Sequence, residues 1–319
     1  MQILVTGGAG FIGSNLVEAL LRDERVSFVR VLDNLSTGSY NNLLELTDSP
    51  NFEFLEGDIR DYDTCLEACE GIDLIAHQAA LGSVPRSIMD PLTTNAVNIT
   101  GTLNIFQAAV HQKVKRVVFA ASSSTYGDSE TLPKVEDEIG APLSPYAVTK
   151  YVNELYADVF SKTYDFEYVG LRYFNVFGPK QDPNGAYAAV IPLFMKAALT
   201  NNEPTINGDG SYSRDFTYVE NAVQANLLAL FSDNKAAINQ VYNIAFGERT
   251  TLNQLWGYIK DVSGTPVEAV HGEQRVGDIP HSLADISKAK TLLSYRPTMD
   301  VKTGLKQAFK WYANNGTYA

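Results

Sequence analysis

Apolar residues in the first half of the chain gather in short runs that alternate with longer amphipathic stretches. Six runs that contain β-branched residues predict buried strands, at 2–7, 27–33, 52–59, 73–80, 116–123 and 167–176. Helices are predicted between them, near 11–22, 61–70, 90–112 and 145–164. Short buried strands that alternate with helices indicate βαβ units and a parallel sheet covered on both faces. The predicted fold class is therefore α/β, with a doubly wound parallel sheet.

The pattern changes after Gly178. The turn-rich segments GPKQDPNG and NGDGS interrupt the chain, and one more strand is predicted at 241–245. Helices are predicted near 188–200, 219–232, 251–263, 285–294 and 301–314. We therefore expect a sheet domain over residues 1–177 and a smaller mixed α/β lobe over residues 178–319. The chain is expected to cross back to the sheet domain around 216–246.

Composition places the chain among ordinary globular proteins. Its 319 residues are 45% hydrophobic and 19% charged, which excludes disorder, and a chain of this length can bury a large core. With 37 acidic and 25 basic side chains the formal charge is −12, which argues against nucleic-acid partners and anionic membrane surfaces. It does not argue against a small anionic ligand, because such a ligand experiences only its local site.

The sequence predicts no metal site, membrane span or export signal. Two cysteines, Cys65 and Cys69, and four scattered histidines do not supply the four ligands of a structural zinc site. No apolar run is long enough to cross a bilayer, and a strand that begins at Gln2 leaves no room for a signal peptide. A cytoplasmic protein is therefore expected.

A glycine-rich turn follows the first predicted strand directly. Gly7, Gly10 and Gly13 have G-x-x-G-x-x-G spacing and lead into the helix predicted at 11–22. Glycine permits the tight turn and lets the backbone approach a pyrophosphate. The N-terminus of the helix supplies free N–H groups and a partial positive charge to the phosphates. The motif therefore predicts dinucleotide binding in a Rossmann-type domain.

Asp33, which ends the second predicted strand 20 residues beyond Gly13, favours NAD over NADP. A carboxylate at this place accepts hydrogen bonds from the adenosine ribose and repels a 2′-phosphate. The following NLST segment contains no arginine that would reverse the preference. Asp58 and Ile59 are expected near the adenine, with a plain helix N-cap as the alternative role of Asp58. The other expected cofactor contacts are Phe11, Ile12, Asn34, Ser36, Thr37, Gly38, Gln78, Ala79 and Ala80.

A tyrosine and a lysine stand four residues apart in the helix predicted at 145–164. Tyr146 and Lys150 therefore share one helix face. The ammonium is expected to favour the phenolate and to lower the tyrosine pKa from about 10 toward the working pH. Tyr146 is thus a candidate general base for the oxidation of an alcohol. A hydroxyl of the SSSTYG segment, at the end of the fifth predicted strand, can hydrogen-bond the same substrate oxygen.

Together these motifs resemble the extended short-chain dehydrogenases/reductases, and among them the nucleotide-sugar 4-epimerases. TGGAGFIGS, LDNLSTG, EGDIRD, HQAA, SSSTYG, SPYAVTK, LRYFNVFGP, GDGSYSRDF and RVGD occur in the family's order and spacing, over nearly the whole chain. Related dehydratases carry a Thr-Asp-Glu-type run where this chain has three serines, and related decarboxylases usually place a glutamate there. The resemblance therefore implies oxidation and re-reduction at one carbon, with NAD retained.

The resemblance also implies a role for each catalytic candidate. Tyr146 takes the proton of the sugar 4-hydroxyl while hydride passes to NAD, and Lys150 holds the nicotinamide ribose. Ser122 hydrogen-bonds the 4-oxygen, and Ser123 and Ser124 are the alternatives for that role. The 4-keto sugar then rotates and takes the hydride back on its other face.

A UDP-sugar is the implied substrate. The residues expected around it are Gly82, Ser83, Ser123, Ser124, Asn175, Gln181, Ala189, Val190, Arg214, Arg275, Asp278 and Ser282, with Phe174 against the nicotinamide. Arg214 and Arg275 would hold the phosphates, because a guanidinium donates two parallel charge-assisted hydrogen bonds. Ser282, four residues after the aspartate of RVGD, would leave room for an acetamido group on carbon 2 of the sugar.

We therefore expect a member of the UDP-N-acetylglucosamine 4-epimerase subgroup. The alternatives are a UDP-glucose or UDP-glucuronate 4-epimerase, a net oxidoreductase of nucleotide sugars, and an inactive NAD-binding protein. The resemblance further implies a homodimer, paired through the helices predicted at 90–112 and 145–164. The apolar residues of these helices could instead face the sheet; they include Ile105, Phe106, Val152 and Leu155.

Overall fold

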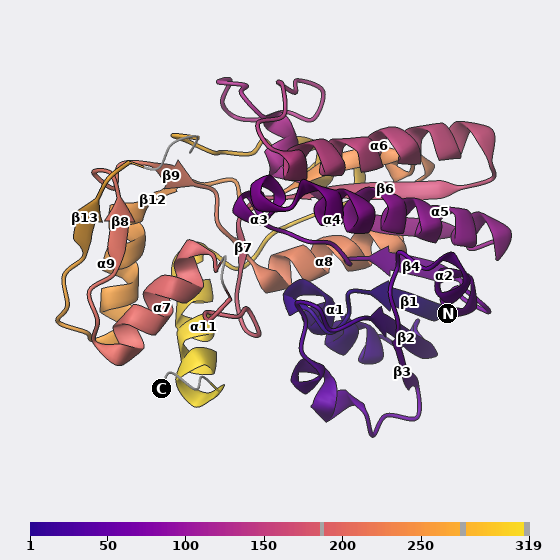
Figure 1. The fold of residues 1–319 in the computed structure, drawn as a ribbon, viewed down its shortest axis with the longest axis horizontal. Coiled ribbons are helices and arrows are strands. Elements are labelled where there is room, and N and C mark those ends of the chain that lie inside the picture. Colours follow the sequence, from indigo (N-terminus) through magenta and orange to yellow (C-terminus); the bar gives the residue numbers. More distant parts are fainter. Residues whose placement is uncertain (186–187, 275–278, 316–319) are drawn as a thin grey trace.

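The computed structural model of the protein describes residues 1–185, 188–274 and 279–315. Seven parallel strands form its main sheet, in the order β11-β6-β5-β4-β1-β2-β3 (Figure 1). Their bounds are β1 (Gln2–Thr6), β2 (Phe28–Asp33), β3 (Phe52–Glu56), β4 (Leu74–His77), β5 (Arg116–Ser122), β6 (Glu167–Tyr173) and β11 (Gln240–Ile244). The predicted fold class and all seven predicted strands are confirmed.

The strand order reverses between β1 and β4. The chain passes outward from β1 to β2 and β3, and then returns to place β4 on the other side of β1. In a doubly wound sheet the helices after β1 and β4 therefore cover opposite faces, and a crevice opens between them at the carboxyl ends of the strands. The topology thus predicts where a ligand binds.

Helices cover both faces of the sheet, as the alternating pattern predicts. The first face carries α1 (Phe11–Leu21) and α8 (Val219–Leu230), and the second carries α2 (Tyr62–Ala68), α5 (Thr102–His111) and α6 (Pro145–Thr163). Both α8 and β11 come from the second half of the chain, so residues 219–244 belong to the sheet layers (Figure 1).

The helix predicted at 90–112 differs in detail. It consists of α4 (Pro91–Asn95), a π-helical turn over Ala96–Gly101, and α5. A further short helix, α3 (Val84–Met89), precedes it and was not predicted. Ser83 caps α3 by accepting a hydrogen bond from the Arg86 N–H at 3.2 Å. Serine and proline are common in loops, so the sequence of this segment does not by itself predict a helix. Both residues are also favourable at the start of a helix, which is where the structure has them.

The remaining elements form a lobe at one side of the sheet (Figure 1). Its helices are α7 (Val190–Thr200), α9 (Leu252–Ser263), α10 (Ser287–Leu292) and α11 (Val301–Asn315). Three pairs of short strands complete it: β7 (Val176–Phe177) with β10 (Thr217–Tyr218), β9 (Ser213–Arg214) with β12 (Thr250–Thr251), and β8 (Thr205–Asn207) with β13 (Val270–Gly272). The helices were predicted, and these six strands were not.

Within residues 1–185, 188–274 and 279–315, no helix is both long enough and apolar enough to cross a membrane.

Candidate active site

A cleft of about 540 Å³ lies at the carboxyl ends of the strands; we call it the strand-end cleft. It is lined by turns that follow β1, β2, β3, β4, β5 and β6. The predicted cofactor residues among its lining are Gly7, Gly10, Phe11, Ile12, Gly13, Asp33, Asn34, Ser36, Thr37, Asp58, Ile59, Gln78, Ala79 and Ala80, together with Tyr146 and Lys150. The turns that follow six strands, together with α6, therefore meet where the topology predicts a ligand site.

The glycine turn leaves no space for side chains. Gly7 has a φ of +69°, and a Cβ added to it would lie 2.6 Å from the Ala79 nitrogen. A Cβ on Gly13 would lie 2.1 Å from the Gly7 carbonyl oxygen, and one on Gly38 would lie 2.8 Å from the Ala9 carbonyl carbon. Gly38 does not line the strand-end cleft but packs against the glycine turn. The turn has the close backbone packing that a dinucleotide pyrophosphate site requires.

Asp33 is buried at the end of β2 and is fixed by the backbone around it. Its carboxylate accepts hydrogen bonds from the N–H groups of Ala9 at 2.9 Å and Leu35 at 2.8 Å. Burial raises the pKa of this carboxyl, and the two N–H groups oppose that effect. The carboxylate therefore lies beside both the glycine turn and the segment after β2, where a ribose would be held.

Asp58 lies beside Asn34, whose side-chain amide donates to its carboxylate at 2.9 Å. The Arg60 guanidinium also binds this carboxylate, and it lowers the carboxyl pKa to about 2. The N-cap of α2 is Asp61, which accepts from the Asp63 N–H. The alternative role of Asp58 as the helix cap is therefore wrong.

Tyr146 and Lys150 project from the first two turns of α6. The helix begins at Pro145, after Ser144, whose hydroxyl accepts a hydrogen bond from the Ala147 N–H at 3.1 Å. The Lys150 ammonium lies 6.0 Å from the centre of the Tyr146 ring and donates to the Ala120 carbonyl of β5 at 2.8 Å. Both side chains line the strand-end cleft, as their i,i+4 spacing predicts.

The expected effect of the lysine on the tyrosine does not appear in this structure. Burial raises the pKa of Tyr146 above its usual value, and a hydrogen bond with the Ser122 side chain opposes it. Burial also lowers the pKa of the Lys150 ammonium to about 8, with the Glu154 carboxylate acting in the other direction. The predicted lowering of the tyrosine pKa by Lys150 is corrected, because desolvation is the larger effect.

The three serines after β5 have different positions. Ser122 and Ser123 line the strand-end cleft, whereas Ser124 does not. The Ser122 hydroxyl accepts hydrogen bonds from the Ser124 N–H at 3.1 Å and the Ser124 hydroxyl at 2.9 Å. Of the three, only Ser122 has a hydroxyl that affects the Tyr146 pKa.

A second cleft, the lobe cleft, adjoins the first and has a volume of about 750 Å³. The two share the lining residues Gly82, Asn175, Val176 and Gln181. Further predicted substrate residues along the lobe cleft are Ser83, Ala189, Val190 and Arg214. One continuous depression therefore brings together the predicted cofactor and substrate residues.

Some predicted site residues lie elsewhere. The Phe174 side chain is fully buried, with its ring 5.9 Å from that of Tyr126, and it lines neither cleft. Tyr173, its neighbour, lines the strand-end cleft in its place. Ser282 also lines neither cleft, and its N–H donates to the Ser213 carbonyl at 3.0 Å. Arg275 and Asp278 lie outside the described residues.

Asn98 was not identified from the sequence. It is fully buried in the π-helical turn, and its side-chain amide holds the backbone of Leu81 by two hydrogen bonds of 2.8 and 3.2 Å. Its Nδ2 also donates to the Thr149 hydroxyl on α6 at 3.1 Å. Asn98 thus fixes the segment after β4 against the helix that carries Tyr146 and Lys150. The sequence does place an asparagine on the buried side of a predicted amphipathic helix, and a buried polar side chain needs hydrogen-bond partners, so Asn98 could have been identified from that pattern.

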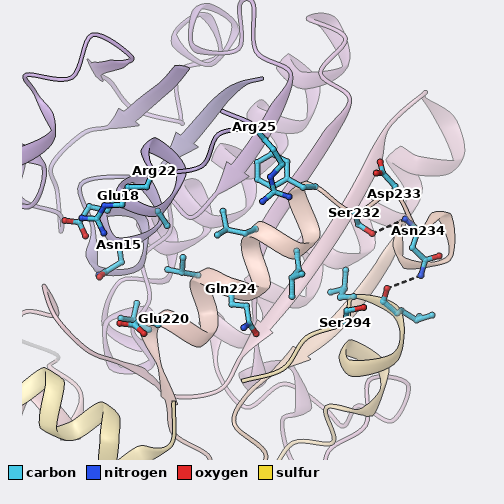
Figure 2. A pocket seen from close by; sticks show the side chains of 18 of the residues that line it. Asn15, Glu18, Arg22, Arg25, Glu220, Gln224, Ser232, Asp233, Asn234 and Ser294 are labelled. Atoms are coloured by element: carbon cyan, nitrogen blue, oxygen red, sulfur yellow. Dashed lines mark hydrogen bonds between the residues drawn. The ribbon is translucent and has the colours of Figure 1, made fainter. Parts of the chain in front are cut away.

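A third hollow, also of about 750 Å³, lies between α1, α8 and the segment that follows α10 (Figure 2). Its lining includes Asn15, Arg22, Glu220 and Gln224. None of the predicted site residues lines it, so this hollow lies outside the candidate active site.

The model of the NAD dependent epimerase/dehydratase family matches residues 3–245. A UDP-glucose 4-epimerase from Mycolicibacterium smegmatis is 36% identical over 98% of this chain and 99% of its own length.

Two solved structures are similar over the whole fold. One is a UDP-N-acetylglucosamine 4-epimerase from Methanobrevibacter ruminantium in complex with UDP-N-acetylmuramic acid, with a TM-score of 0.92, 41% identity and 98% coverage of both chains. The other is a UDP-glucose 4-epimerase from Thermus thermophilus in complex with NAD, with a TM-score of 0.88 and 33% identity. It covers 99% of this chain and 100% of its own.

Proposed function

Because this chain belongs to the NAD dependent epimerase/dehydratase family and is a nucleotide-sugar 4-epimerase, we propose that it interconverts UDP-N-acetylglucosamine and UDP-N-acetylgalactosamine. Residues 1–177 would hold NAD, and residues 178–319 would hold most of the sugar nucleotide. The continuous depression formed by the two clefts supports this division, since it joins the predicted residues of both sets.

The strand-end cleft fits the cofactor. Its glycine turn excludes side chains, and its carboxylate Asp33 lies at the place of the adenosine ribose. NAD, when bound, supplies the acceptor and donor of hydride for carbon 4 of the sugar. Ser122, Tyr146 and Lys150 lie over the other half of the sheet, where the nicotinamide half of a dinucleotide extends.

The chain's own residues then handle the proton. In our proposal the Tyr146 oxygen takes the proton of the 4-hydroxyl, and the Ser122 hydroxyl, which lowers the Tyr146 pKa against the effect of burial, holds the same substrate oxygen. Lys150 is anchored on the Ala120 carbonyl and keeps a positive charge on the same side of the cleft. In the return step Tyr146 gives the proton back, so no net charge or redox equivalent remains on the protein.

The preference for an acetamido sugar is supported chiefly by one side chain at the junction of the clefts. The Gln181 amide oxygen is buried and has no hydrogen-bond partner among the described residues, while its Nε2 donates to the Val176 carbonyl at 3.4 Å. A buried acceptor without a partner is costly, and an N–H donor from a ligand would satisfy it. The acetamido group offers such a donor, and the small residues Gly82 and Ser83 line the same cleft as Gln181.

UDP-glucose is the second candidate substrate, because relatives of similar identity bear that name. The purified protein should be mixed separately with UDP-N-acetylglucosamine, UDP-glucose and UDP-glucuronate, without added cofactor, and the epimers resolved by NMR. Fastest turnover of the acetamido sugar is expected. Turnover that requires added NAD in stoichiometric amounts would instead indicate a net oxidoreductase.

Ser282 provides a separate test of the same preference. Ser282 lines neither cleft, so its side chain does not itself border the sugar site in this structure. The resemblance nevertheless implies that the longer side chain of Ser282→Tyr removes activity on the acetamido sugar and spares activity on UDP-glucose. Equal loss on both sugars would contradict the proposed role of this position.

We also propose a homodimer paired through α3, α4 and α6. Several large apolar side chains on these helices are exposed: Ile88, Met89, Leu92, Val148, Leu155 and Val159. Ile105 and Phe106, by contrast, are fully buried on α5 and face the sheet. An apolar patch of this kind is typical of an interface between subunits.

A further inference from the structure

One polar side chain interrupts the apolar stripe with which α8 faces the sheet. The inward positions are Ala222, Ala225, Asn226 and Ala229, all completely buried. Glu220 and Gln224 lie on the other side of the helix and border the hollow shown in Figure 2. Alanine lets the helix approach the sheet closely, so an asparagine in the same stripe must be hydrogen-bonded to be tolerated.

Asn226 closes a ring of three hydrogen bonds with Gln78 and Tyr173. Its Nδ2 donates to the Tyr173 hydroxyl at 2.7 Å, and that hydroxyl donates to the Gln78 Oε1 at 3.2 Å. The Gln78 Nε2 donates back to the Asn226 Oδ1 at 3.0 Å. Each side chain donates once and accepts once within the ring. A single flipped amide would face donor with donor, and flipping both amides would remove the hydrogen bond from the Asn226 Nδ2 to the Ala222 carbonyl at 2.8 Å. The ring and this carbonyl together fix the orientation of both amides.

Two of the three members belong to the strand-end cleft. Gln78 follows β4 and Tyr173 ends β6, and both line the cleft, whereas Asn226 does not. Gln78 and Tyr173 follow or end β4 and β6, in the half of the strand order that also contains β5 with Ser122, whereas Asp33 and Asp58 belong to the half formed by β2 and β3. The ring therefore supports the part of the cleft that takes the nicotinamide half of the cofactor.

The helix that carries Asn226 is itself anchored. Arg116 on β5 is buried, and its Nη1 donates to the carbonyls of Ala229, Leu230 and Ser232 at 3.0, 2.9 and 2.9 Å. The Asn226 Nδ2 also donates a second hydrogen bond, to the Ala222 carbonyl at 2.8 Å. The Ala222 carbonyl therefore fixes the Asn226 side chain, and Arg116 fixes the end of α8 to the sheet. A side chain that is fixed in this way can fix the positions of Gln78 and Tyr173.

We propose that Asn226 is a positioning residue that acts through Gln78 and Tyr173 to keep the cofactor tightly bound between the two hydride transfers. It touches neither the cofactor nor the sugar. The inference rests on the proposed function, because only an enzyme that uses the same cofactor molecule twice needs such retention.

The test compares two asparagines of α8. Asn226→Leu breaks the ring, whereas Asn221→Leu removes an equally buried amide whose partners among the described residues are the Thr298 and Met299 backbone. We expect Asn226→Leu to weaken NAD binding about tenfold or more, as loss of a buried partner implies. Its kcat at saturating NAD should stay within a few-fold of the unaltered enzyme. Asn221→Leu should lower the melting temperature and leave NAD binding unchanged.

The result that overturns the proposal is NAD binding by Asn226→Leu as tight as that of the unaltered protein, or equal weakening in both variants. Tyr173→Phe provides a test that does not depend on the folding of the leucine variant, because it removes only the hydroxyl. It should weaken NAD binding, and the double variant should be no weaker than Asn226→Leu alone. Unchanged binding in Tyr173→Phe, or additive losses, would also overturn it.

NAD content and epimerase activity of the unaltered protein are measured first and separately. An unaltered protein that holds NAD but epimerises none of the UDP-sugars contradicts the proposed function. The ring would still be tested by NAD titration, so the two failures are distinguishable.

Discussion

The ion pair between Glu154 and Arg172 adjoins the proposed catalytic pair on α6, and its removal should cost more stability than any surface substitution. Glu154 is one turn beyond Lys150 on α6, and Arg172 lies on β6. The guanidinium makes hydrogen bonds of 2.9 and 2.7 Å to the two carboxylate oxygens. Only 4% of the Arg172 side chain and 6% of the Glu154 side chain are exposed. The substitution to test is Glu154→Gln, which keeps the shape and removes the charge.

The magnitude follows from what Arg172 retains. Burial lowers the pKa of this guanidinium and Glu154 raises it. Arginine is not deprotonated in proteins, so the charge persists after Glu154 is substituted. Its other partners are the Tyr126 hydroxyl at 3.1 Å and the Glu136 carbonyl at 2.9 Å, both neutral. Removing one member of a buried pair costs roughly 3–5 kcal/mol. At about 2–4 °C for each kcal/mol, the melting temperature should fall by at least about 6 °C.

Glu167→Gln is the matched control. Glu167 binds Arg116 with hydrogen bonds of the same lengths, 2.9 and 2.7 Å, but its side chain is 38% exposed. Arg116 also retains three backbone carbonyl partners. The control should therefore lose only about 1 kcal/mol.

Urea unfolding followed by circular dichroism, with the NAD content of every sample matched, measures both losses. Two variants with equal losses would refute the reasoning, because burial would then not determine the cost. A loss below about 1 kcal/mol for Glu154→Gln would refute it as well.

Three further predictions concern the site, the surface and the acid limit. Tyr146→Phe should lower kcat by about 10²-fold or more while the purified protein still contains NAD, and near-normal turnover would contradict the base assignment. The double variant Leu155→Glu, Val159→Glu should turn a dimer into a folded monomer in analytical ultracentrifugation, whereas an unchanged mass would place the interface elsewhere. His77 is buried between the hydroxyls of Thr6 and Thr102, and burial lowers its pKa to about 3. Its stabilising contribution is present above the unfolded pKa of about 6.5 and should be lost as the pH falls from there toward 3. His77→Gln should flatten this dependence in pH-resolved unfolding experiments, and an unchanged slope would refute the assignment.

The sheet could be predicted because its strands are long enough to display a pattern. A strand of four or more residues that is buried on both faces appears as an apolar run. The pairs β7–β10 and β9–β12 contain only two residues in each strand, which is too few for any period. Their pairing depends on how the lobe packs against the sheet, and this packing cannot be predicted from the residues adjacent to them in the sequence.

The same distinction applies to the site. The glycine turn with Asp33 and the Tyr146–Lys150 pair could be found because their spacing is local or fixed by one βαβ unit. Asn226 could not, because its partners Tyr173 and Gln78 are 53 and 148 residues away in the chain. The helical period of the sequence predicts only that Asn226 is a polar residue on the buried face of a helix. Its role depends on tertiary contacts.

Tyr146 shows how a correct motif can still predict the wrong electrostatic result. The i,i+4 spacing correctly places the ammonium of Lys150 on the same helix face, but spacing carries no information on depth. At 6.0 Å from the ring, and bonded to the Ala120 carbonyl, the ammonium does not outweigh the loss of water around the phenol. The tyrosine therefore stays protonated in the protein alone. A further positive charge in the strand-end cleft would favour the phenolate, and oxidised NAD, held there as we propose, would supply one through its nicotinamide ring.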